Sequence, residues 1–261
     1  MIAHLSEIEV CHDGCLNNPS LADVLSDLAV REVAICDTSE PGRPLQSGSN
    51  ASALNKLFMA EDLPSKVLIA LADQPFGGII EYTGPGDIEL LRSAIKRLRG
   101  DQAFINISSR TAYGSDIAYH FCSLLDTCLQ LRASLKVDLS IILQEATANA
   151  ILHGNLEVES APNGTGIDGL EEQYGRVEER LATPALAARR LEISAHWTAD
   201  ELFVSVTNEG AGYDFSEMPA VPAERPRRGI PLIASLADSC TIDLGGRRLN
   251  FVINRQRDSA R

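Results

Sequence analysis

Glu145 and Asn149 are the residues whose types and spacing point most directly to chemistry. They lie in the segment QEATANAILHGN (residues 144–155), which has the pattern of a helix that ends near His153 with Gly154 and Asn155 as its C-cap. Residues four apart lie one above the other on a helix, so the carboxylate and the carboxamide share one face. Such a pair can hold a hard, oxygen-liking cation and orient a water molecule. The arrangement therefore indicates chemistry on a Mg²⁺-bound nucleotide.

A glycine-rich turn, NEGAGY (residues 208–213), directly follows the strand predicted at residues 202–207. Gly210 and Gly212, one residue apart, let the backbone turn sharply and approach a flat ligand closely. Asn208, at the end of the strand, is placed to hydrogen-bond that ligand. An ordinary β-turn with two glycines is the alternative that these residues leave open.

A second glycine motif, RRGIP (residues 227–231), opens the helix predicted at residues 230–237. The free amides at a helix N-terminus favour anions, and Gly229 admits a close approach. Pro231 suits the first turn of a helix. The motif is compatible with phosphate binding; a solvated basic pair ahead of an ordinary helix is the alternative, which the motif taken alone slightly favours.

In this order, the three motifs resemble the ATP-binding fold shared by histidine kinases, DNA gyrase, mismatch-repair ATPases and heat-shock chaperones of the ninety-kilodalton class. Within that superfamily, residues 103–256 are most similar to the anti-sigma-factor serine kinases of partner-switching systems. The pattern ExxxNAxxHGN at 145–155 matches the polar box, NEGAGYD at 208–214 the first glycine box and RGIPLI at 228–233 the second.

The resemblance implies ATP and Mg²⁺ as cofactors and a role for each matched residue. Asn149 is expected to coordinate Mg²⁺, and Glu145 to act as the general base that takes a proton from the attacking hydroxyl. The remaining ATP-binding residues are expected to contact adenine or phosphate: Asn208, Gly210 and Gly212 at the adenine, and Arg228, Gly229 and Ile230 at the phosphates. Residues 218–227 would form a short lid, stiffened by three prolines.

Asn208 is a departure from the family, which usually has Asp there. The Asp accepts a hydrogen bond from the adenine amino group, and loss of a charged acceptor costs on the order of 1 kcal/mol or more. We therefore expect weak to moderate ATP binding that Asn208→Asp tightens.

The function that the resemblance implies is ATP-dependent phosphorylation of a small antagonist protein, with a sigma factor as a second partner. Relatives commonly dimerise, so a homodimer is also open. An ATP-sensing or non-catalytic adaptor with the same fold is the main alternative. A sensor-type histidine kinase that uses His120 is a weaker one, because a strand rather than a dimerisation hairpin precedes the predicted helix at residues 115–131.

Composition narrows the classes of partner. The 261 residues carry a formal charge of −13, which argues against broad contact with nucleic acid or anionic membrane. The N-terminus lacks the pattern of a signal peptide, and no stretch has the ~18 apolar residues of a membrane span. We therefore expect a cytoplasmic protein with no nucleic-acid or membrane partner.

The order of apolar runs predicts an α/β protein with two domains. Residues 101–261 are expected to form an α/β sandwich, with helices on one face of a mixed, mainly antiparallel sheet; residues 1–100 are expected to form a parallel α/β layer. The predicted strands are 7–11, 32–36, 66–72, 78–82, 103–107, 191–197, 202–207, 239–244 and 248–254. The predicted helices are 21–29, 51–60, 87–98, 115–131, 137–153, 169–190 (interrupted at Pro184) and 230–237.

The N-terminal hundred residues faintly resemble a response-regulator receiver. Asp37 follows a predicted strand, as a phosphoacceptor does, but too few residues precede it, and Tyr82 to Pro85 replace the expected lysine. We therefore expect a degenerate receiver-like domain, or an unrelated α/β domain, that is not phosphorylated at Asp37 and that docks a partner or dimerises.

Overall fold

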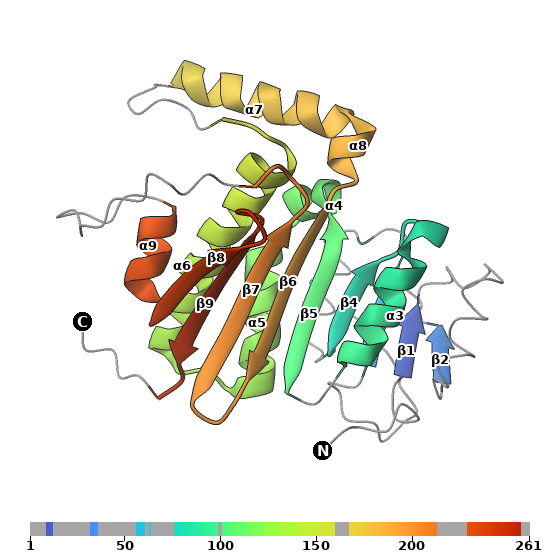
Figure 1. The fold of residues 1–261 in the computed structure, drawn as a ribbon, viewed down its shortest axis with the longest axis vertical. Coiled ribbons are helices and arrows are strands. Elements are labelled where there is room, and N and C mark those ends of the chain that lie inside the picture. The colour runs from blue at the N-terminus through green and yellow to red at the C-terminus, as the bar shows by residue number, and fades with distance from the viewer. Residues whose placement is uncertain are drawn as a thin grey trace.

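A computed structural model describes residues 9–12, 32–35, 56–60, 63, 76–98, 101–159, 167–212 and 229–256 (Figure 1). In this part of the chain the strands form one nine-stranded sheet in the order β2-β1-β3-β4-β5-β6-β7-β9-β8. The strands are β1 (Glu9–His12), β2 (Glu32–Ile35), β3 (Lys56–Ala60), β4 (Gly78–Glu81), β5 (Gln102–Ser108), β6 (Arg190–Trp197), β7 (Glu201–Asn208), β8 (Ser239–Asp243) and β9 (Arg248–Asn254).

The sheet has a parallel half and an antiparallel half that share β5. From β2 to β5 every neighbouring pair is parallel, whereas β5, β6, β7, β9 and β8 pair in antiparallel fashion. Short turns join β6 to β7 and β8 to β9, and in the second of these Gly245 and Gly246 have φ of 65° and 86°. The α/β class and the mixed sheet are thus confirmed. The pairing of β4 with β5 continues the sheet across residues 100 and 101.

Helices cover the two faces unequally (Figure 1). The helices are α3 (Ile88–Arg97), α4 (Ser109–Gly114), α5 (Ile117–Leu129), α6 (Ala133–Ala148), α7 (Ile167–Ala182), α8 (Pro184–Ala187) and α9 (Ile230–Leu236), with a 3₁₀ turn at Pro85–Asp87 and a π-helical turn at Asn149–Asn155. On one face α5 and α6 pack behind the sheet, and on the other α3 covers the parallel strands.

The larger core lies between the sheet and the α5–α6 pair. It contains helix residues such as Phe121 and Leu139 and strand residues such as Ile193. It also includes Phe58 and Ile79 of the parallel strands, so one continuous apolar layer supports both halves. A smaller core joins Leu91 and neighbouring α3 residues to β3, β4 and β5.

The helix predicted at residues 51–60 is wrong for residues 56–60, which form β3. This strand lies between β1 and β4, and Leu57 to Ala60 have no exposed surface. A strand buried on both faces has no alternation of apolar and polar residues, so its pattern does not distinguish it from a buried helix. The expected helix at residues 115–131 starts later, at Ile117, and α4 precedes it. The predicted elements at residues 21–29 and 66–72, and Asp37, lie outside the described residues.

Candidate functional site

The polar helix is longer than the sequence predicts. It continues past α6 as the π-helical turn to Asn155, closed by a bond from the Leu156 amide to the Ile151 carbonyl (2.8 Å). Gly154 therefore does not take the left-handed conformation of a C-cap. Single π turns within helices are frequent at functional sites. This π turn begins at Asn149, directly after the last turn of α6, which contains Glu145.

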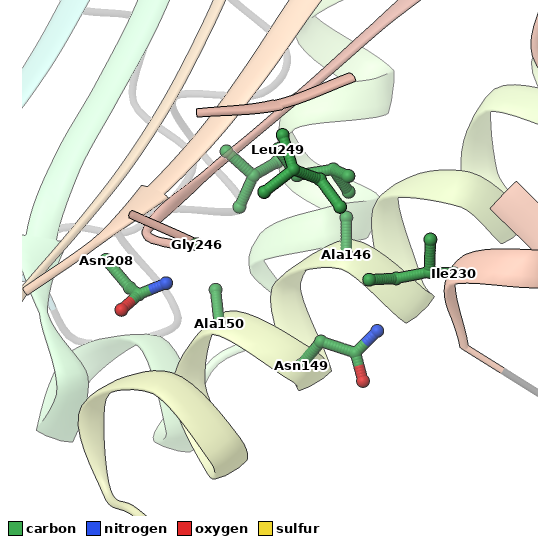
Figure 2. Close-up of a pocket in the computed structure, with 9 residues that line it drawn as sticks. Ala146, Asn149, Ala150, Asn208, Ile230, Gly246 and Leu249 are labelled. Carbon is green, nitrogen blue, oxygen red and sulfur yellow. The ribbon is translucent and has the colours of Figure 1, made fainter. Parts of the chain in front are cut away.

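A pocket beside this helix brings together three of the predicted site residues (Figure 2). Asn149 comes from the helix, Asn208 from the end of β7 and Ile230 from the start of α9. The other lining residues are Ala146, Ala150, Val206, Ile242, Gly246 and Leu249. The cavity of about 10 Å³ has room for about one water molecule, so a larger ligand requires the lining residues to move apart. Its walls are mainly apolar, with an amide side chain at each end.

Asn208 lies at one end of the pocket and is 4 % exposed. Its side-chain oxygen accepts a hydrogen bond from the Gly210 amide (2.9 Å), and its nitrogen donates to the Arg247 carbonyl (3.2 Å). Figure 2 shows this side chain on the same side of the pocket as Gly246, facing Ala150. These two bonds fix the orientation of the amide, and both its oxygen and its nitrogen are hydrogen-bonded to the protein backbone.

The glycines after β7 have packing roles. A Cβ atom on Gly210 would lie 1.9 Å from the carbonyl oxygen of Gly154, and one on Gly212 would lie 2.0 Å from that of Gly245. Gly212 also has φ of 87°. The turn can therefore lie against both the helix end and the β8–β9 hairpin only because these side chains are absent. Gly210 and Gly212 do not line the pocket, whereas Gly246 does.

Glu145 meets the start of α9 at the other end of the pocket. Its carboxylate accepts a hydrogen bond from the Gly229 amide (2.9 Å), and Gly229 has φ of 89°. The Asn149 side-chain nitrogen lies 3.9 Å from the position that a Cβ of Gly229 would occupy. The predicted base, metal ligand and phosphate-binding glycine thus lie together. Arg228 and the predicted lid at residues 218–227 lie outside the described residues.

Asn155 is a site residue whose role the sequence did not reveal. It has no exposed surface; its side chain donates to the Arg190 carbonyl (3.0 Å) and accepts from the Glu209 amide (2.8 Å). It therefore joins the end of the polar helix to the start of β6 and to the turn after β7. In the sequence it was visible only as the last residue of the matched polar box and as part of the expected C-cap.

His120, the alternative phosphoacceptor, is buried in α5 with 5 % of its surface exposed. Burial lowers the pKa of its imidazole, and the nearby Asp116 carboxylate opposes this shift. A histidine in this position favours the neutral form and is closed to a transferring phosphoryl group.

The described residues contain neither a ready-made metal cluster nor a membrane-spanning helix. There, no three His, Cys, Asp or Glu side chains gather into a group that could hold a metal ion. Glu145 and Asn149 do offer a carboxylate and an amide oxygen from adjacent helical turns, and Mg²⁺ in nucleotide sites commonly takes only one or two protein ligands beside the phosphates. None of the described helices is long and apolar enough to span a membrane. Neither a protein-family model nor any curated protein matches this chain.

Proposed function

We propose that the pocket binds ATP with Mg²⁺ and that the protein is a serine/threonine protein kinase of the anti-sigma-factor type. The observation that supports this best is the convergence of Asn149, Asn208 and Ile230, from three distant segments, on one pocket. Glu145 and Gly229 lie in hydrogen-bond contact at its rim. These are residues for which the motif order implies ATP binding. They belong to separate segments of the chain, so the fold and not nearness in the sequence brings them together.

In this proposal each end of the pocket has its own task. Asn208 and the apolar wall receive the adenine, whereas Asn149 contributes an oxygen to Mg²⁺, which neutralises phosphate charge when bound. Glu145 takes the proton of a substrate hydroxyl as that oxygen attacks the γ-phosphorus and the bond to ADP breaks. To do so, its carboxylate must release or share the Gly229 amide that it holds in this structure. Positioning and charge stabilisation supply most of the rate in such transfers.

The proposed substrate is a small antagonist protein, with a sigma factor as the alternating partner and the cytoplasm as the site of action. The acidic chain, with a formal charge of −13, is compatible with protein rather than nucleic-acid partners. A homodimer remains part of the proposal. So does a receiver-like role for the N-terminal strands as a docking region, supported by the strand order β2-β1-β3-β4-β5, which is that of doubly wound sheets.

A non-catalytic, ATP-sensing adaptor is the second candidate. Two observations favour it: both ends of the Asn208 amide are used within the protein, and Glu145 is engaged by the Gly229 amide. Nucleotide binding without transfer is the behaviour that these contacts would produce if they persisted in the bound state.

Incubation with γ-labelled ATP, Mg²⁺ and candidate antagonist proteins separates these functions. Phosphoserine or phosphothreonine on the antagonist supports the kinase, binding without transfer supports the adaptor, and phosphohistidine on the chain itself would support the histidine kinase. Absence of nucleotide binding would refute the kinase and the ATP-sensing adaptor.

Two substitutions at Glu145 test its role directly. Glu145→Gln keeps an oxygen for the Gly229 amide but removes the base, so transfer should fall by about 10²–10⁴-fold while ATP affinity changes little. Glu145→Ala also removes the contact with Gly229. Equal transfer rates in the wild type and Glu145→Gln would show that Glu145 is only a structural acceptor.

A further inference from the structure

Arg190 connects the parallel half of the sheet to the turn that carries Asn208. Its side chain donates to the Glu81 carbonyl (2.6 Å) and forms an ion pair with Asp87 (2.8 Å). Its other terminal nitrogen lies 3.9 Å from the Glu81 carboxylate. The side chains of Arg190, Glu81 and Asp87 are only 11 %, 8 % and 15 % exposed. This buried cluster joins the start of β6 to the end of β4 and the cap of α3.

The backbone of the same residue reaches the candidate site. The Arg190 amide donates to the Glu209 carboxylate (2.8 Å), and its carbonyl accepts from Asn155 (3.0 Å). Asn155 in turn accepts from the Glu209 amide (2.8 Å). Glu209 directly follows Asn208, which lines the pocket. Arg190 therefore bonds to the chain neighbour of a pocket residue.

Strand register explains this arrangement. Ser108 at the end of β5 pairs with Arg190, and Leu191 pairs with Asn208 at the end of β7. The carboxyl ends of β4, β5 and β7 therefore lie at the same end of the sheet, and neighbouring strands there are about 4.8 Å apart. In doubly wound sheets the edge formed by the carboxyl ends of the strands is where ligands bind. The Glu81–Asp87 cluster thus lies on the same edge as the pocket, a few strands away.

We propose that Arg190 is a positioning residue of the pocket, through which the acidic cluster of Glu81 and Asp87 sets the position of the Asn208–Gly210 turn. A change at this cluster alters how Arg190 is held, and the two backbone bonds carry the change to Glu209. The Glu81–Asp87 cluster at the end of β4 then regulates the affinity of the pocket for the nucleotide. The regulatory part of this inference rests on the proposed nucleotide binding; the positioning of the turn does not.

Asp87→Asn is the test variant, because it removes the charge that faces Arg190 while keeping the shape and an acceptor for Thr83. Hydrogen exchange of the Glu209 and Gly210 amides is measured in the protein without nucleotide. Exchange should quicken by about twofold to thirtyfold, the range of coupling along packed networks. In calorimetry with Mg²⁺ and a non-hydrolysable ATP analogue, the Kd should rise by a similar factor. Arg190→Lys should reproduce both effects, and adding Asp87→Asn to it should then have little further effect.

Arg97→Lys is the matched control. Arg97 also bridges the two halves of the sheet, from α3 to Glu192 of β6 (2.7 and 3.0 Å), but the bonds of this pair do not lead to the turn. It should lower stability without altering the exchange of Glu209 and Gly210. Unchanged exchange in Asp87→Asn, or an equal change in Arg97→Lys, would overturn the inference. Failure of the wild type to bind the analogue would instead refute the proposed function, and the exchange experiment would still decide the role of Arg190.

Discussion

Replacing Gly210 by alanine tests the packing on which the candidate site depends. The new Cβ would lie 1.9 Å from the carbonyl oxygen of Gly154 and 2.4 Å from its carbonyl carbon. Both are backbone atoms, so no side chain can rotate away. The turn after β7 and the end of the polar helix would have to separate.

The cost can be estimated from what must move. Overpacking of a well-packed region costs about 1–3 kcal/mol. Separation would also weaken the bond of the Glu209 amide to Asn155, which contributes about 1 kcal/mol. We therefore expect Gly210→Ala to lower the free energy of unfolding by about 2–4 kcal/mol, a large part of the ~5–15 kcal/mol that holds a typical domain together.

Urea denaturation followed by circular dichroism measures this difference. The matched control is Gly175→Ala in α7, where a Cβ meets no atom within 4 Å. Because alanine favours a helix more than glycine does, this variant should be more stable than the wild type by about 0.5–1 kcal/mol. If Gly210→Ala unfolded within about 0.5 kcal/mol of the wild type, the close contact with Gly154 would be refuted.

Three further predictions follow from other contacts. Asn208→Asp should tighten ATP binding in calorimetry, yet lower the free energy of unfolding by about 1–3 kcal/mol, because the donor to the Arg247 carbonyl is lost; unchanged affinity and stability would contradict both parts. Burial raises the pKa of Glu192, but its bonds to Arg97 outweigh this and hold the pKa below its usual value. Stability should therefore fall as the pH drops below about 4.3, and Glu192→Gln should lack this part of the acid titration of unfolding. Burial raises the pKa of the Cys122 thiol to about 11, so its contribution to stability is present at neutral pH and lost as the pH rises towards that value. Denaturation at alkaline pH should show a smaller loss in Cys122→Ala.

The sequence predicts best those parts of the fold whose residues alternate or recur locally. In β6 and β7, apolar and polar residues alternate, and Ile193 and Val206 lie paired on the buried face. The α3 helix carries Leu91 and Ile95 on one buried stripe. Such periodicity reflects one-sided burial, so it identifies the element without knowledge of its neighbours.

The remaining features depend on neighbours that no local pattern specifies. Lys56–Ala60 is a strand because β1 and β4 flank it, not because of its own residues. In the site, Asn149 and Asn208 were predicted from motifs, but the contact of Gly210 with Gly154 depends on how two distant segments pack. The same applies to Arg190, which meets Glu81 from more than a hundred residues away in the chain.

The register of the antiparallel strands decides whether the pocket exists at all. Successive side chains point to opposite faces of a sheet, so a slip of one residue between β6 and β7 would turn Val206 away from α6 and move Asn208 off the end of its pairing with Leu191. The Asn155 bonds to the Arg190 carbonyl and the Glu209 amide can form in only one register, because they join the two strands at a single level. A buried polar side chain that must satisfy both partners penalises every other register, since an unpaired buried group costs about 1–3 kcal/mol. Asn155 therefore contributes to the site by selecting the pairing that places Asn208 opposite Asn149, even though it does not line the pocket itself.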